Sequence, residues 1–175
     1  VLDVDEGVRQ VAAKSLGRSK DPSSGESLGR LLNDPSPFVR ATAAEAIGHL
    51  SDKTSLPLLF RHMDAMDPLH TRHAFVYALM QMKDPVGLKT FLHDDSQPYR
   101  QKIALRVLHA LESDLDSASV LPLLNSEDLG LREEARRVVS SRKEWQDEML
   151  RVFREISVEE NPKLTDLQLM EGMIL

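Results

Sequence analysis

Histidine residues are the side chains of this chain best suited to bind a metal ion, and three of them lie close together: His62, His70 and His73. His70 and His73 are three residues apart and would share one face of a helix. Imidazole nitrogens bind zinc, copper, iron and nickel. Two ligands do not form a site, however, and no carboxylate occupies a partnering position on that face. We therefore interpret these histidines as surface and structural residues, and we expect no metal site.

Other motifs of catalytic or ligand-binding sites are incomplete. The segment from Asp114 begins like an EF-hand loop, but it lacks the central glycine and has Asn125 where a bidentate glutamate belongs. Gly25 and Gly29 form neither GxGxxG nor a P-loop. The absence of cysteine excludes disulfides, thiolate catalysis and cysteine-ligated zinc. No nucleophile lies in an elbow motif. We expect no enzymatic activity and no cofactor.

Charge and hydropathy narrow the range of partners. The net charge of -6 and the isoelectric point near 5.5 argue against nucleic-acid binding, which requires lysine and arginine along one face. No apolar run approaches the roughly 20 residues that cross a bilayer. We therefore expect a protein partner, no nucleic acid, no membrane insertion and a monomeric chain. The compartment is left open, with the cytoplasm slightly favoured.

Five arginines recur along the chain, each followed by a similar apolar pattern: Arg9, Arg40, Arg72, Arg100 and Arg132. Their spacings of 31, 32, 28 and 32 residues are typical of stacked helical hairpins. The inward faces of the first two units are expected to be Val8, Ala12, Ala13 and Leu16, then Val39, Ala43, Ala44 and Ile47. Gly17 and Gly48 are expected to end these helices as left-handed caps. The pattern predicts an all-α fold, a right-handed α-solenoid (α–α superhelix) of about five hairpins.

The array is expected to cover residues 1–156 and to begin inside a repeat, as a fragment of a longer protein. Val1, Leu2 and Asp3 precede Arg9 as Leu32, Asn33 and Asp34 precede Arg40. The unit around Arg132 has the features of a terminal repeat. A closing amphipathic helix is predicted from one apolar stripe, Trp145, Met149, Val152, Phe153 and Ile156. Residues 157–175 are left as a tail that forms a short helix, joins a partner or stays mobile.

The repeat unit resembles HEAT repeats of the short bacterial kind, also called phycobilin-lyase-type HEAT repeats. The unit Asp-Pro-x-x-x-Val-Arg-x-x-Ala-Ala-x-x-Ile/Leu-Gly is nearly intact at Asp34–Gly48 and recognisable at Asp3–Gly17. The resemblance implies an α-solenoid whose first helices line the convex side and whose alanine-rich second helices line the concave side. HEAT-like iron hydroxylases use His-Glu dipeptides, which this chain lacks, and HEAT-like DNA glycosylases need a cationic groove, which the acidic balance opposes.

The five repeat arginines are interpreted as structural residues, because regular recurrence suits a stacking ladder better than a catalytic device. We expect them to bond carbonyl groups or the turn aspartates of neighbouring units, Asp21, Asp52 and Asp84.

A candidate binding stripe follows from counting one, five and nine residues beyond each repeat arginine, since these positions project together from a helix. The stripe begins with Gln10, Lys14, Arg18, Ala41 and Glu45 and ends with Glu133, Arg137 and Ser141. Its central part mixes aromatic and polar side chains with a leucine expected to be exposed, as binding anchors often do. The predicted partner-binding residues are His49, His73, Tyr77, Gln81, Leu105 and His109.

The sequence thus predicts a non-catalytic scaffold that binds a protein partner on its concave helix face. Two alternatives stay open. One is a lyase-like or chaperone-like role that handles a tetrapyrrole on a partner protein, which only the fold analogy supports. The other is a purely structural spacer within a larger enzyme.

Overall fold

Helices make up the secondary structure of the residues that the structure describes. The structure is a computed structural model that describes residues 3–151 with the exception of residues 22, 94–96, 146 and 149. Within these residues the ordered elements are α-helices and 3-10 helices joined by short turns, and no β-strand occurs. The predicted all-α fold class is confirmed.

The chain forms two compact units, Val1–Leu88 and Lys89–Leu175, and each is described by itself. The first unit contains α1 (Glu6–Ser19), α2 (Ser24–Leu31), α3 (Pro37–Leu50), η1 (Lys53–Ser55), α4 (Leu56–His62), α5 (Leu69–Met82) and the start of α6 (Pro85–Thr90). The second contains the end of α6, η2 (Phe91–His93), α7 (Pro98–Ala110), α8 (Ser117–Val120), η3 (Leu121–Asn125), α9 (Leu129–Ser140) and η4 (Lys143–Trp145).

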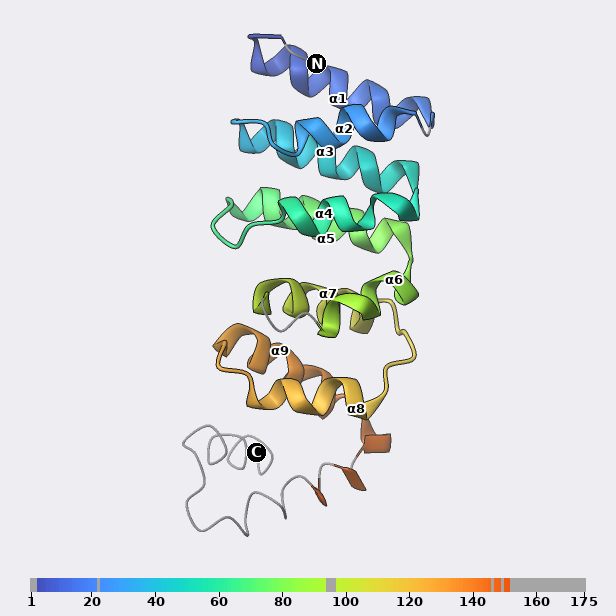
Figure 1. Ribbon diagram of the computed structural model, residues 1–175, viewed down its shortest axis with the longest axis vertical. Helices are drawn as coiled ribbons and strands as arrows, with labels where there is room; N and C mark the ends of the chain where they lie inside the picture. Colours follow the sequence, from blue (N-terminus) through green and yellow to red (C-terminus); the bar gives the residue numbers. More distant parts are fainter. Residues whose placement is uncertain (1–2, 22, 94–96, 146, 149, 152–175) are drawn as a thin grey trace. The chain divides into compact units, whose positions relative to one another are not determined.

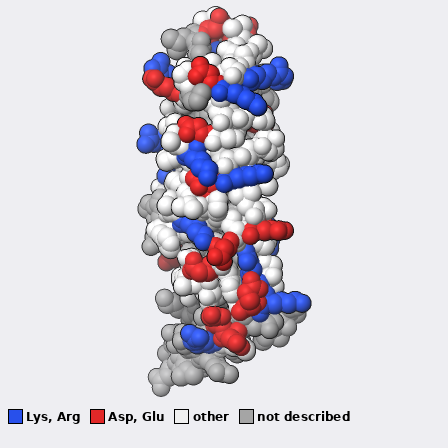
Figure 2. Space-filling view, turned by 90° about the vertical axis from the view of Figure 1, so that its right-hand side faces the viewer, with Lys and Arg blue, Asp and Glu red and all other residues white. Residues whose placement is uncertain are grey.

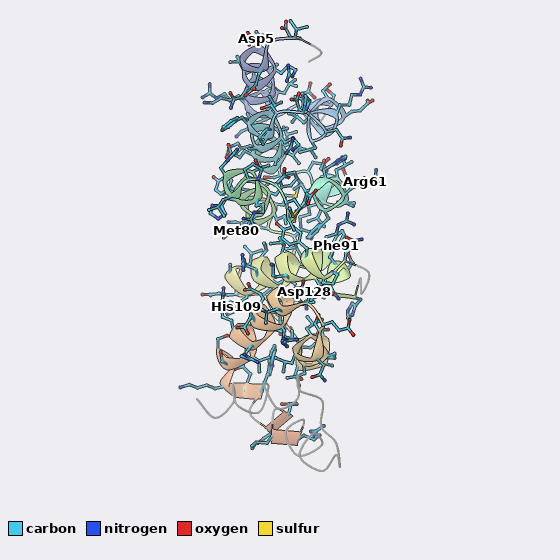
Figure 3. All side chains as sticks on the ribbon, turned by 90° about the vertical axis from the view of Figure 1, so that its left-hand side faces the viewer. Asp5, Arg61, Met80, Phe91, His109 and Asp128 are labelled. Atoms are coloured by element: carbon cyan, nitrogen blue, oxygen red, sulfur yellow. The ribbon has the colours of Figure 1, made fainter. Side chains whose placement is uncertain are left out.

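The helices of the first unit lie in two layers. The three long helices α1, α3 and α5 follow one another in one layer, and α2 and α4 lie in front of them (Figure 1). The same two layers are seen from the side in Figure 3, with Met80 labelled on α5 and Arg61 on α4. The central helix α3 packs against both α1 and α5. Ala43, Ala44 and Ile47 of α3 are fully buried, so the apolar pattern after Arg40 forms the centre of this core.

Side-chain caps begin these helices, and residues with a left-handed backbone conformation end them. Asp5 accepts a hydrogen bond from the Val8 amide at 3.1 Å, and Ser36 accepts one from the Phe38 amide at 3.2 Å. Lys20 and Ser51 adopt positive φ angles of 54° and 53° directly after α1 and α3. The chain therefore reverses at residues that lie three positions beyond the predicted glycines.

Gly17 and Gly48 do not cap helices, and this prediction is wrong. Both are buried within helices that continue to Ser19 and Leu50, and no described glycine has a positive φ. A Cβ on Gly17 would lie 2.8 Å from the Cα of Ala46, and a Cβ on Gly48 would lie 2.7 Å from the Cα of Ala78. The glycines are present because the neighbouring helix passes too close for any side chain.

The apolar face of α1 is only partly covered, which also differs from prediction. Ala13 is fully buried, but Val8 is 51% exposed, and Ala12 and Leu16 are half-buried. Within the first unit α1 packs against α2 and α3, so only the side of α1 that faces these helices is shielded from water.

The repeat arginines bind aspartates and carbonyls at the starts of the inner helices. Arg9 donates to both carboxylate oxygens of Asp34, from Nε at 2.7 Å and from Nη2 at 2.8 Å. Arg40 donates to the carbonyl of Asp34 at 2.8 Å and pairs with the carboxylate of Asp67. Each of these arginines thereby ties its own helix to the start of the next.

The predicted pairing with the turn aspartates Asp21, Asp52 and Asp84 is wrong. Asp21 accepts from the Ser23 amide and Asp52 from the Thr54 amide, each two residues ahead, because aspartate in a tight turn bonds its own backbone. Asp84 lies 3.7 Å from Nζ of Lys53. The remaining repeat arginines vary: Arg132 donates to the carbonyl of Ser126 at 2.8 Å, and Arg72 and Arg100 are half-buried.

In the second unit α7 packs against α9 and η2, and α8 leads into η3. Trp145 is buried in η4, with the guanidinium of Arg142 5.5 Å from its ring centroid. Arg142 also donates to the carbonyl of Ser113 at 3.0 Å, which ties this end of the unit to the turn after α7. The rest of the predicted closing stripe, Met149, Val152, Phe153 and Ile156, and the tail 157–175 lie outside the described residues.

Candidate functional site

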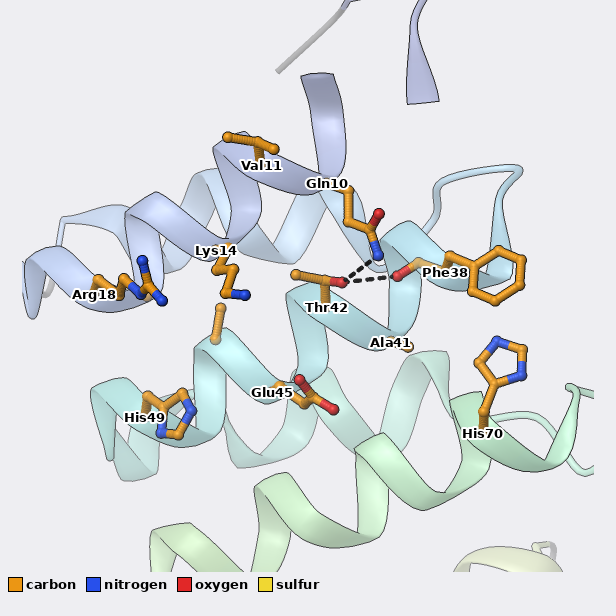
Figure 4. A pocket seen from close by; sticks show the side chains of 12 residues that line it. Gln10, Val11, Lys14, Arg18, Phe38, Ala41, Thr42, Glu45, His49 and His70 are labelled. Atoms are coloured by element: carbon orange, nitrogen blue, oxygen red, sulfur yellow. Dashed lines mark hydrogen bonds between the residues drawn. The ribbon is translucent and has the colours of Figure 1, made fainter. Parts of the chain in front are cut away.

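A groove of about 590 Å³ runs between α1 and α3 and reaches the start of α5, all within the first unit (Figure 4). This volume is within the range of sites that hold small ligands or a few side chains of a partner. The lining residues are Gln10, Val11, Lys14, Gly17 and Arg18 from α1, Phe38, Ala41, Thr42, Glu45, Ala46 and His49 from α3, and His70 from α5.

Small residues where the helices meet create this groove. Gly17 lies against Ala46, so the backbones of α1 and α3 come close together there. The longer side chains of both helices then stand on either side of the contact. Because these helices are fixed from behind by fully buried Ala13, Ala43 and Ala44, the groove exists before any ligand binds.

One end of the groove is aromatic. The rings of Phe38 and His70 are stacked, with centroids 4.6 Å apart and an interplanar angle of 16°. Phe38 is 52% exposed although it is a large apolar side chain. An exposed ring that a neighbouring helix holds in one orientation can bury apolar area against a ligand at little entropic cost.

The other end of the groove is polar and carries charge. Figure 4 shows Lys14, Arg18 and His49 together at the end away from Phe38, with Glu45 between the two ends. Lys14 and Arg18 supply two positive charges and Glu45 one negative charge, an excess of one positive charge in a chain whose net charge is -6. Neither Lys14 nor Arg18 forms an ion pair with another described residue.

A hydrogen bond joins the two walls near the aromatic end. The side-chain amide of Gln10 donates to the hydroxyl of Thr42 at 3.2 Å, and that hydroxyl donates to the carbonyl of Phe38 at 3.0 Å. Both bonds are drawn in Figure 4. This connection fixes the first turn of α3, on which Phe38 lies, relative to α1.

Some of the predicted partner-binding residues are close to the groove. His49 lines it, and the ring of Tyr77 meets the ring of His49 edge to face at 6.3 Å. Tyr77 is 44% exposed, and His73 and Gln81 are exposed on α5 without lining the groove. The structure thus brings His49 and Tyr77 together and leaves His73 and Gln81 beside them on the same helix as Tyr77.

The prediction that Leu105 is exposed is wrong, since its side chain is fully buried. In α3, the residues three and four positions beyond Arg40 are buried. In α7, the residues three, four and also five positions beyond Arg100 are buried, and the fifth is Leu105. The repeat that ends at Arg100 is the shortest, 28 residues, and α7 is rotated so that Leu105 and Gln101 turn inward. Gln101 donates to the carbonyl of Leu92 at 2.8 Å. His109, also on α7, is half-buried (Figure 3).

Phe38 and His70 were not among the predicted binding residues. Each lies two residues before its repeat arginine, Arg40 or Arg72, so the two rings occupy equivalent places in successive repeats. Extending the count from the arginines toward the helix start would have found this pair.

The histidine cluster considered for metal binding does not come together. His70 stacks on Phe38, His73 is exposed, and burial followed by the charge of Arg61 lowers the pKa of His62. Among the described residues, no three histidine, aspartate or glutamate side chains gather as a metal ion would require.

Comparison with known families accounts for the repeat pattern. A family model described as HEAT repeats matches residues 2–80 and residues 26–109. The chain belongs to the HEAT-repeat family. HEAT repeats stack as helical solenoids, are typically non-catalytic and generally mediate protein–protein interaction. No curated protein matches this HEAT-repeat chain.

Acidic and basic side chains are interspersed on the face of each unit that Figure 2 shows. None of the described helices has both the length and the apolar character that spanning a membrane requires.

Proposed function

We propose that this chain is a non-catalytic scaffold that binds a partner protein through the groove between α1 and α3 and the adjoining exposed residues of α5. This is the face that the sequence pattern predicts to be concave.

The observation that carries the proposal is the preformed groove. It is lined by an aromatic pair and by two cations without an ion-pair partner among the described residues, and Ala13, Ala43 and Ala44 of the helices behind it are fully buried. The stacked rings of Phe38 and His70 lose little conformational freedom on binding, so more of their contact energy appears as affinity. Phe38 and Tyr77 supply the exposed rings that commonly anchor an interface.

Site-specific cross-linking tests the proposed surface. A photoreactive amino acid is placed at Ala41, which lines the groove, and in a matched chain at Ala118, which is exposed on α8. Both chains are incubated with extract of the source organism and irradiated. We expect a cross-linked protein from position 41 that is absent from position 118.

Competition with unlabelled chain makes the result specific. Excess unlabelled chain should remove the product, and excess of a Phe38→Ser/Tyr77→Ser variant should not. Equal products from both positions, or equal competition by the variant, would contradict binding at this surface.

A further inference from the structure

The groove between α1 and α3 has two chemically different ends, and their separation sets what can bind along it. Phe38 and His70 form the aromatic end, and Lys14 and Arg18 lie toward the end at His49 (Figure 4). Along α3, His49 lies eleven positions beyond Phe38, which at about 1.5 Å per residue is a distance of roughly 16 Å. An extended peptide covers this distance with about five residues.

The charges of the groove select the sign of its ligand. Lys14 and Arg18 are exposed and lack ion-pair partners among the described residues, so an incoming carboxylate does not have to displace an existing partner. Glu45 lies between the two ends and disfavours a second acidic group there. A ligand with its acidic groups at the His49 end and a neutral or basic middle therefore meets a complementary surface.

We infer that the partner segment bound in this groove is a short extended peptide with an apolar side chain at one end and acidic side chains about four to five residues away. The apolar side chain packs on Phe38 and His70, and the acidic side chains pair with Lys14 and Arg18. This inference rests on the proposed function and adds the chemistry of the partner. The groove volume of about 590 Å³ accommodates a few side chains of a segment and not a folded domain.

Fluorescence anisotropy with labelled synthetic peptides tests the inference on the whole chain. The probe peptide contains a leucine, three serines and two glutamates in that order. Control peptides replace the leucine with serine, replace both glutamates with lysine, or replace the middle serine with glutamate. We expect each control peptide to bind at least about tenfold more weakly than the probe. Equal binding of the probe and the lysine peptide would overturn the inference.

A charge-swap experiment distinguishes a change in charge recognition from a variant that fails to fold. The Lys14→Glu/Arg18→Glu variant should lose the glutamate peptide and gain the lysine peptide, whereas Lys143→Glu, which changes an exposed lysine of η4, should leave both affinities unchanged. A variant that binds neither peptide while keeping its helical circular dichroism contradicts the inference. Displacement of the probe by free glutamate or phosphate at equal concentration would show anion binding alone and would overturn it.

The two hypotheses can fail separately. If the cross-link from position 41 is specific but the peptides bind without regard to charge, the binding surface stands and the inferred chemistry of the partner segment is wrong. If the cross-link is not specific, the proposed surface fails and this inference fails with it.

Discussion

Arg9 and Asp34 form a two-point ion pair between successive repeats, with donor–acceptor distances of 2.7 Å and 2.8 Å. The side chains are 13% and 5% exposed, so water screens this pair less than a surface pair. Asp34 also accepts from the Ser36 amide at 2.9 Å and thereby shapes the turn that starts α3. One carboxylate therefore fixes both the start of its own helix and the position of the preceding one.

Replacing Asp34 should destabilise the first unit. In Asp34→Ala the guanidinium of Arg9 loses its charged acceptor, and the Ser36 amide loses its partner. We expect the free energy of unfolding to fall by about 2 kcal/mol. Urea unfolding followed by circular dichroism measures this loss. The matched control is Glu26→Ala, which removes an exposed ion pair with Arg30 and should cost less than about 1 kcal/mol. Equal losses in the two variants would contradict a special role for the Arg9–Asp34 pair.

The carboxylate of Asp34 should also make the stability of the fold depend on pH. Hydrogen bonding from Arg9, the largest cause, holds the pKa of Asp34 below its usual value. A group with a lowered pKa in the folded state stabilises the fold above its unfolded pKa, about 3.9 for aspartate, and loses this contribution as pH falls through its folded pKa. Thermal unfolding at pH 6 and at successive values below pH 4 should therefore show a smaller acid-induced drop in Tm for Asp34→Asn than for the unchanged chain. If Tm falls equally with pH in both chains, Asp34 does not contribute to the loss of stability in acid.

Gly17 should be intolerant of a side chain because of Ala46. A Cβ at Gly17 would lie 2.7 Å from the Cβ and 2.8 Å from the Cα of Ala46, and the Cα belongs to the backbone of α3 and cannot rotate away. In Gly17→Ala the helices must separate, and we expect a loss of about 1–3 kcal/mol despite the better helix propensity of alanine.

Gly29→Ala serves as the control for Gly17→Ala. Its nearest neighbour is the flexible Cδ1 of Leu58 at 3.4 Å, an ordinary contact distance. This variant should be neutral or more stable by up to about 1 kcal/mol. Chemical denaturation measures the free energy of unfolding of both variants. A Gly17→Ala variant that is more stable than the unchanged chain would mean that α1 and α3 are not in close contact at this position.

The repeat organisation could be predicted from the sequence because it depends on periodicity. The five recurring arginines lie one in each of α1, α3, α5, α7 and α9, so the period of the sequence is the period of the long helices. The role of the glycines could not be predicted in the same way. A glycine near the end of a helical pattern has the same local sequence whether it caps the helix or packs against another one, and only the neighbouring Ala46 or Ala78 distinguishes the two cases.

Side-chain positions on a helix surface were predictable only where the repeats keep one register. In the first two repeats the count from the arginines gives residues that line the groove, such as Lys14, Glu45 and His49. It fails at Leu105, where a spacing of 28 residues accompanies a rotation of the buried face. The length change is visible in the sequence, but the direction of rotation depends on how α7 packs, which no local pattern specifies.

The burial of Leu105 leads to a last prediction that separates the two interpretations of this residue. A fully buried leucine leaves a cavity when it is shortened, so Leu105→Ala should lower the free energy of unfolding by about 2–5 kcal/mol. Leu129 in α9 is a matched control in the same unit, because it is 61% exposed, and Leu129→Ala should change stability by less than about 0.5 kcal/mol. Calorimetry or urea unfolding of both variants measures the difference. If the two substitutions have the same small effect, the burial of Leu105 in the core of this unit is contradicted.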